Sequence, residues 1–122
     1  MAERARYIMI ASMDVDPEHE QAFNEIYDTE HVPFLSRVPG VLSIKRCVRE
    51  ELVMNIGGER KTIRLENEPK YTAIYELASP DVLTSEAWDK AVERGRWPSE
   101  VRPFTRNRRH VLLKIIEPEA DE

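Results

Sequence analysis

The chain has 122 residues, 34% charged and 41% apolar, a balance typical of one folded domain and too apolar for a disordered protein. The net charge of -5 argues against a general nucleic-acid binder, which needs a basic surface. No apolar run approaches the roughly 20 residues of a membrane span, and the first residues lack a signal-peptide core. The lone cysteine, Cys47, cannot form a disulfide within the chain. We therefore expect a single domain over residues 1–122, located in the cytoplasm, with neither a nucleic-acid nor a membrane partner.

The first predicted elements are a strand and a helix. The apolar run Tyr7–Met13 predicts a strand buried on both faces, because polar residues do not alternate with apolar ones. The Asp-Pro pair at 16–17 predicts a helix start, with aspartate as N-cap and proline at the first helical position. Because Pro33 disfavours a helical conformation in the residue before it, we expect the helix to end near Glu30 and the chain to turn over residues 34–38.

A second strand and a hairpin follow. Pro39-Gly40 predicts a tight turn, and the run Val41–Val48 predicts a strand. The charged segment Arg49–Pro69 contains Ile56-Gly57-Gly58-Glu59, which is typical of a hairpin turn. We expect an exposed hairpin here, with arms at residues 52–54 and 62–65.

The last part of the chain predicts a strand, a helix and a further strand. Tyr71–Leu77 predicts a strand, and Ser79-Pro80-Asp81 the start of a helix that Gly95 ends. Arg109–Glu117 predicts the final strand, followed by a loose acidic tail over residues 118–122.

This order of elements is typical of the α+β ferredoxin-like βαββαβ sandwich, a four-stranded antiparallel sheet with two helices on one face. The hairpin is an addition between the second and third strands of that sheet. Because the predicted strands are apolar on both sides, the face without helices must be buried against another chain or a ligand.

Several motifs follow one another along residues 6–116: Asp16-Pro17, Phe23, Tyr27, His31-Val32-Pro33, Pro39-Gly40, Pro69–Leu77 and the stretch Pro98–Arg109. Together they resemble the EthD-like branch of the dimeric α+β barrel superfamily. The resemblance implies a homodimer in which two sheets pack face to face into a barrel, with a cavity for a small aromatic or polyketide-like molecule. The longer Arg49–Glu68 hairpin is a departure, which we expect to reshape the cavity mouth or extend the dimer contact.

His31 is the candidate catalytic residue. It lies four residues after Tyr27, which lies four after Phe23, so the three share one helical face if the helix continues. At a cavity, a histidine can act as general acid or base or bind a substrate oxygen. Alternatively, a cationic imidazole caps the C-terminus of the helix.

Aromatic residues are the candidate ligand-binding residues, because they combine apolar area with a polar tip. They are Tyr27, Tyr71, Tyr75, Trp88 and Trp97. The alternative for each is a plain packing role.

The basic cluster Arg106, Arg108, Arg109 and His110 lies near the C-terminus. Ion pairs at the surface or at a dimer interface are the common role of such a cluster, and bidentate binding of a carboxylate or phosphate is the alternative. The sequence has no metal-ligand spacing, phosphate-binding loop or nucleophile elbow, so we expect no metal and no other cofactor.

These observations predict a homodimer that binds a small apolar or aromatic molecule. If it is an enzyme, we expect cofactor-free proton transfer of the dehydratase, cyclase, isomerase or monooxygenase type, with His31 as acid or base. One alternative is a non-catalytic dimeric binding or stress-type protein. The other is a haem-binding or haem-degrading protein, in which His31 or His110 would be the axial ligand.

Overall fold

The structure, a computed structural model, describes residues 4–116. Four strands form one antiparallel sheet in the order β2–β5–β1–β6. These strands are β1 (Tyr7–Val15), β2 (Val41–Val48), β5 (Tyr71–Leu77) and β6 (Thr105–Lys114). The remaining two, β3 (Leu52–Ile56) and β4 (Glu59–Ile63), pair only with each other. This arrangement confirms the predicted ferredoxin-like α+β fold with its additional hairpin.

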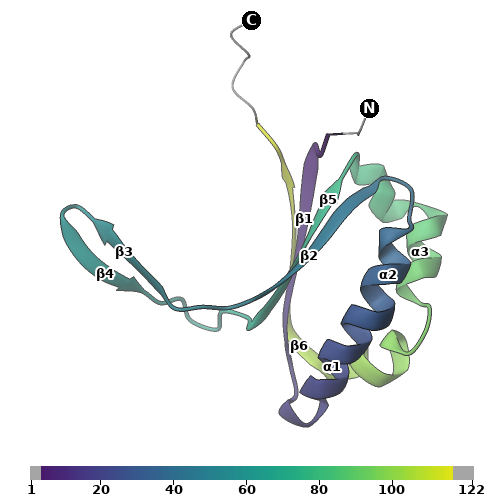
Figure 1. Cartoon of the computed structure of the whole chain (residues 1–122), viewed down its shortest axis with the longest axis horizontal. Coiled ribbons are helices and arrows are strands. Elements are labelled where there is room, and N and C mark those ends of the chain that lie inside the picture. Colours follow the sequence, from purple (N-terminus) through teal and green to yellow (C-terminus); the bar gives the residue numbers. More distant parts are fainter. Residues whose placement is uncertain (1–3, 117–122) are drawn as a thin grey trace, which may run out of the picture.

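Two helical stretches cover one face of the sheet (Figure 1). The first comprises a 3₁₀ turn (Pro17–His19), α1 (Glu20–Ile26), a π turn (Tyr27–His31) and α2 (Val32–Ser36). The second comprises a 3₁₀ turn (Pro80–Thr84), α3 (Glu86–Val92), a π turn (Trp97–Val101) and a 3₁₀ turn (Arg102–Phe104). Within residues 4–116, no helix is both long and apolar enough to cross a membrane. The predicted tail and Glu117 lie outside the described residues.

The two faces of the sheet differ in burial. On β1, alternate side chains from Met9 to Val15 are buried under the helices, and on β5 the same holds for Ala73, Tyr75 and Leu77. The other face, called the open face below, carries half-buried and exposed apolar side chains. They are Ile8, Ile10, Ile74, Val111 and Leu113. The expected burial of β1 on both faces is therefore not reached within one chain.

The prediction that the first helix ends near Glu30 was wrong, as was the predicted turn over residues 34–38. The helical path continues through Pro33 to Ser36. In the π turn, the N–H of Val32 donates to the carbonyl of Tyr27, five residues back. This wider turn shifts the preceding carbonyls and accommodates a proline ring that a regular α-helix would exclude. His31 therefore lies inside a continuous helical stretch.

The last strand begins at Thr105, four residues before the predicted start at Arg109. Thr105 pairs with Val15 across a register shift, next to which Asn107 adopts a positive φ of 54°. The predicted strand began only where the pairing with β1 becomes regular.

The β3–β4 hairpin, called the arm below, projects from the sheet on the side opposite the helices (Figure 1). Gly57 and Gly58 have φ values of 62° and 82°, as a two-residue type I′ turn requires. The register places Leu52, Met54 and Ile56 on one side of the arm, and all three are exposed. The arm therefore presents an apolar face that its own chain does not cover.

Candidate functional site

A cavity of about 420 Å³ lies between the sheet and the helices. The β1 side chains Met9, Ala11 and Met13 line it on the sheet side. The remaining lining residues come from β5, β6 and the two helical stretches. They are Tyr27, His31, Leu35, Tyr75, Leu83, Trp88, Val92, Trp97, Arg102, Arg108 and His110.

The structure brings together all but one of the site residues predicted from the sequence. His31 and the aromatic residues Tyr27, Tyr75, Trp88 and Trp97 line the cavity. Tyr71 lies outside it, in a separate depression of about 330 Å³, and its hydroxyl donates to the Glu20 carboxylate. A ligand in the main cavity would therefore not meet Tyr71.

His31 is held between aromatic rings. Its ring stacks on Trp97, with 4.1 Å between ring centroids, and meets the edge of Tyr27 at 5.1 Å. The side chain is 5% exposed. Burial, assisted by the positive charge of Arg102, lowers the pKa of His31 from 6.5 to about 4. The imidazole is thus neutral at pH 7, and it does not act as a cationic helix cap.

One nitrogen of this ring is unsatisfied. Nδ1 of His31 is buried and has no hydrogen-bond partner among the described residues. Most buried polar atoms in proteins have a partner, so such an atom marks a place where a bound molecule or water could complete the site.

A pair of tyrosine hydroxyls lies beside the histidine. The hydroxyl oxygens of Tyr27 and Tyr75 are 3.1 Å apart, and both side chains are buried. Burial raises the pKa of each phenol, so both stay protonated at neutral pH. Arg46 packs on the ring of Tyr27, with its guanidinium carbon 4.5 Å from the ring centroid, and pairs with Asp28 at 2.8 Å. These contacts fix the position of the two tyrosine hydroxyls. One hydroxyl hydrogen is used in the bond between them, and the other can be donated to a further acceptor.

Trp97 is positioned by the residue next to His31. The Glu30 carboxylate accepts hydrogen bonds from the backbone N–H of Arg96, at 2.8 Å, and from its guanidinium. Gly95 adopts a φ of 76°, and a Cβ there would lie 2.5 Å from the Glu30 carboxylate. Glycine is thus required for this close approach, which fixes the turn that begins at Trp97.

Two π turns meet at the site, since His31 ends the first and Trp97 begins the second. Single π turns are rare in proteins as a whole, but those that occur are often found at functional sites. Sequence reasoning missed both turns, although each contains or precedes a proline that a regular helix interior would not accept.

Arg102 was not identified from the sequence, and Arg108 and His110 were considered there only as alternatives, without a place in the cavity. Pairing of Ala11 with His110 places that histidine on the helix side of the sheet, and Arg108 two residues away shares its face. A register slip of one residue would move both to the open face, so the sequence alone could not assign them.

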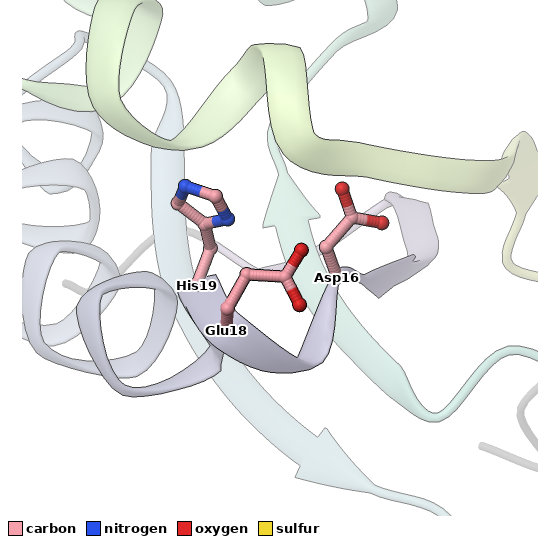
Figure 2. Close-up of side chains that lie close together, drawn as sticks. All are labelled: Asp16, Glu18 and His19. Atoms are coloured by element: carbon pink, nitrogen blue, oxygen red, sulfur yellow. The ribbon is translucent and has the colours of Figure 1, made fainter.

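A second cluster of polar side chains lies at the start of the first helical stretch (Figure 2). Asp16, Glu18 and His19 each offer one ligand atom within 4.8 Å of the others. The Asp16 carboxylate is paired with Arg106 at 3.0 Å, and the His19 ring stacks on Phe104. Because existing contacts hold two of the three side chains, we assign no metal to this cluster.

Comparison with known proteins gives similarity at the level of structure. No protein-family model and no curated protein sequence matches the chain. A crystal structure of an ethyl tert-butyl ether d (EthD) family protein from Bacillus halodurans matches with a TM-score of 0.55 and 15% identity, covering 90% of this chain and 99% of that one.

Two further solved structures are of MhuD. The haem degrader MhuD from Mycobacterium tuberculosis, with two haems in its active site, matches with a TM-score of 0.53 and 10% identity, covering 93% of this chain and 99% of that one. A point mutant of MhuD, with two manganese protoporphyrin IX molecules per active site, matches with a TM-score of 0.56 and 10% identity, covering 93% and 98%. The chain thus has the α+β fold of these proteins, and its resemblance to EthD-like proteins is confirmed at the level of the fold.

Proposed function

We propose that the chain is a homodimeric protein that binds a small, mostly apolar organic molecule in the cavity beside His31. The observation that carries this proposal is the cavity itself, about 420 Å³ in volume, with apolar and aromatic walls and a few polar groups. Volumes and linings of this kind are typical of small-molecule sites. A cytoplasmic location and a single domain over the whole chain stay predictions.

The polar groups inside the cavity suit a ligand oxygen. His31 is neutral at pH 7, and the Tyr27–Tyr75 pair presents a hydroxyl beside it. A group with a pKa of about 4 is a poor proton donor at neutral pH, because it is almost entirely deprotonated. We therefore assign His31 to hydrogen bonding of the ligand.

Cofactor-free proton transfer is the second candidate function. The observation that favours it is the unsatisfied Nδ1 of His31, next to two phenols that stay protonated. In that role His31 would accept a proton while a tyrosine hydroxyl binds the substrate oxygen. Deuterium incorporation into the methyl group of 2-acetylnaphthalene in D₂O tests this role. We expect faster incorporation with the wild type than with His31→Gln. Equal rates would contradict proton transfer by His31 and leave the binding proposal unaffected.

Self-association is supported by the surfaces that one chain leaves uncovered. The open face carries Val111 and Leu113 at 47% and 49% exposure, and the arm projects on the same side of the sheet. A hairpin of two short strands is marginally stable in water, so the apolar face of the arm needs a surface to pack on. A second copy on the open face would cover both surfaces by one symmetric contact. In this proposal the arm extends the dimer contact.

Haem binding, the other alternative, requires a side chain that coordinates the iron. An axial ligand is needed, and His31 or His110 would have to supply it from the cavity wall. Haem titration that leaves the Soret band of free haem unshifted would reject this alternative. A shift that disappears in His31→Ala or in a His110→Ala variant would favour it over the binding of a metal-free molecule.

Tryptophan fluorescence tests the binding proposal directly, because both tryptophans of the chain, Trp88 and Trp97, line the cavity. We expect saturable quenching on titration with the neutral probe 2-naphthamide. The variant Ala11→Leu extends a side chain into the cavity and should weaken binding by about tenfold. Ala87→Leu is the matched control, because it makes the same substitution at an exposed position of α3 outside the cavity lining, and it should bind as the wild type does. Unchanged fluorescence of the folded wild type up to the solubility limit of the probe would contradict the proposal.

A further inference from the structure

None of the ionisable side chains described around the cavity is a carboxylate. They are two arginines, two histidines and two tyrosines, and among the described residues that line it there is no aspartate or glutamate. The chain as a whole has 23 acidic and 18 Lys or Arg residues. The cavity is therefore positive within a protein whose net charge is negative.

The two arginines differ in what they bind. Arg102 is neutralised, since its guanidinium donates to both carboxylate oxygens of Glu93, at 3.0 and 2.8 Å, and to the carbonyl of Val92. The Arg108 side chain makes no hydrogen bond or ion pair with any residue in the described range 4–116. Arg108 is an exposed residue that lines the cavity, two residues from His110 on the same face of β6. A full positive charge is thus available at the cavity without a counterion among residues 4–116.

This charge reaches groups inside the cavity. Arg108 opposes the effect of burial, which raises the pKa of Tyr27, and it adds to the effect of burial in lowering the pKa of His110. Both effects have the sign of a positive potential, which would attract an anion.

We propose that the cavity selects a ligand with an apolar body of one to three rings and one carboxylate group, which the Arg108 guanidinium binds. The apolar body would lie against Met9, Met13 and Trp88, and the carboxylate would accept paired hydrogen bonds from the guanidinium. This inference rests on the proposed function and adds the charge class of the ligand to it.

The neighbouring residue Arg109 provides a matched control. It pairs with Ser12 on the register of β1, so its side chain lies on the open face, where it donates to the carbonyl of Asn67 at 2.7 Å. Replacing either arginine by glutamine removes the same charge from the chain, but only one of the two changes the cavity.

The test compares two probes of nearly equal shape, 2-naphthoate and its neutral amide 2-naphthamide, by tryptophan fluorescence with the full-length chain. For the wild type we expect the carboxylate to bind about tenfold more tightly than the amide. In Arg108→Gln this preference should fall to within about twofold, whereas Arg109→Gln should retain it. Added NaCl should weaken binding of 2-naphthoate and leave 2-naphthamide unaffected.

The outcomes separate this inference from the function on which it rests. Equal binding of both probes by the wild type would overturn the charge preference and leave the binding proposal supported. A preference that persists in Arg108→Gln would overturn the role of Arg108. Failure of both probes to bind would count against the proposed function itself. Circular dichroism melts check that the glutamine variants fold, which we expect because Arg108→Gln loses no side-chain hydrogen bond to residues 4–116 and Arg109→Gln loses only the one to Asn67.

Discussion

A single chain buries the apolar side chains on the two faces of its sheet to different degrees. On the helix side, Phe23, Tyr27 and Trp97 interlock with His31, and all four are at most 5% exposed. On the open side, the apolar residues of β6 and of the arm are exposed to solvent in one chain. The aromatic cluster is thus buried within one chain, whereas the apolar residues of the open face are not.

The two proposed properties, ligand binding and self-association, divide between the two sides in the same way. The helix side holds the cavity in which we propose that the ligand binds, and the buried aromatic cluster forms part of its wall. The open face exposes apolar area of a kind that soluble monomers rarely leave in contact with water. Exposed apolar area of this kind is typical of a surface for association. Changes on one side should therefore leave the property of the other intact.

The largest expected effect is on the aromatic cluster. Trp97→Ala removes the ring that contacts Phe23, Tyr27 and His31, and should lower the free energy of unfolding by about 3–5 kcal/mol. Trp88→Ala is the control, because Trp88 also lines the cavity but is only half-buried, and it should cost about half as much. Urea denaturation measures both values. Similar losses for the two variants would contradict the central place of Trp97.

The pH dependence of stability tests the burial of His31. The folded pKa of about 4 lies below the reference value of 6.5, so the unfolded chain binds a proton first as the pH falls. The His31 contribution is fully present above pH 6.5 and should decline by about 3 kcal/mol on going to pH 4.

His31→Phe keeps a stacked ring and removes the titration, so its stability should decline less steeply over the same range. Carboxylates with lowered pKa values, such as Glu30 beside Arg96, also lose stabilising contacts in acid, and they do so equally in both proteins. The difference between wild type and variant in urea denaturation at pH 7, 6, 5 and 4 isolates the histidine. Parallel curves would mean that His31 is not buried as a neutral ring.

Variants of the arm test the proposed self-association through the open face. A variant with Leu52→Thr, Met54→Thr and Ile56→Thr keeps residues that favour strands while removing the apolar face of the arm. We expect the dimer dissociation constant to rise by about tenfold or more, since three exposed apolar side chains lose their burial. Val53→Thr, on the opposite face of the same strand, should leave the constant unchanged.

Light scattering over a concentration series measures this constant. A wild type that stays monomeric at 100 μM, roughly the upper range of such measurements, would contradict self-association as a whole. A dimer that the triple variant leaves intact would contradict only the role of the arm.

The smallest expected effect concerns the tyrosine pair. Tyr27→Phe removes one hydroxyl from a buried hydrogen bond of 3.1 Å and should cost about 1 kcal/mol. Tyr75→Phe should cost a similar amount, and the double variant less than the sum, because both single changes break the same bond. Strict additivity in urea denaturation would show that the two hydroxyls are not coupled.

The sequence predicted the strands and the hairpin well because their signals are local. The run from Tyr71 to Leu77 and the Gly57-Gly58 turn specify their conformations with neighbouring residues alone. The extent of the first helix was not predictable in this way, since a π turn that accommodates Pro33 depends on packing against the second helical stretch.

The candidate site was predicted in part for the same reason. The stripe of Phe23, Tyr27 and His31 follows from helical spacing, and the structure retains it. The cationic side of the cavity depends on the register of β6 against β1, which local sequence does not specify. Arg108 and Arg109 are chemically alike in the sequence, and only the pairing of strands sends them to opposite faces.

The proposed ligand binding belongs to the helix side, and the proposed self-association belongs to the open side. Methyl NMR of the methionines tests both parts in one sample, because Met9 and Met13 line the cavity and Met54 lies on the apolar face of the arm. We expect 2-naphthamide to shift the methyl signals of Met9 and Met13 and not that of Met54, and dilution to monomer to shift the signal of Met54 alone. A probe that shifts the Met54 signal while leaving those of Met9 and Met13 in place would contradict this division.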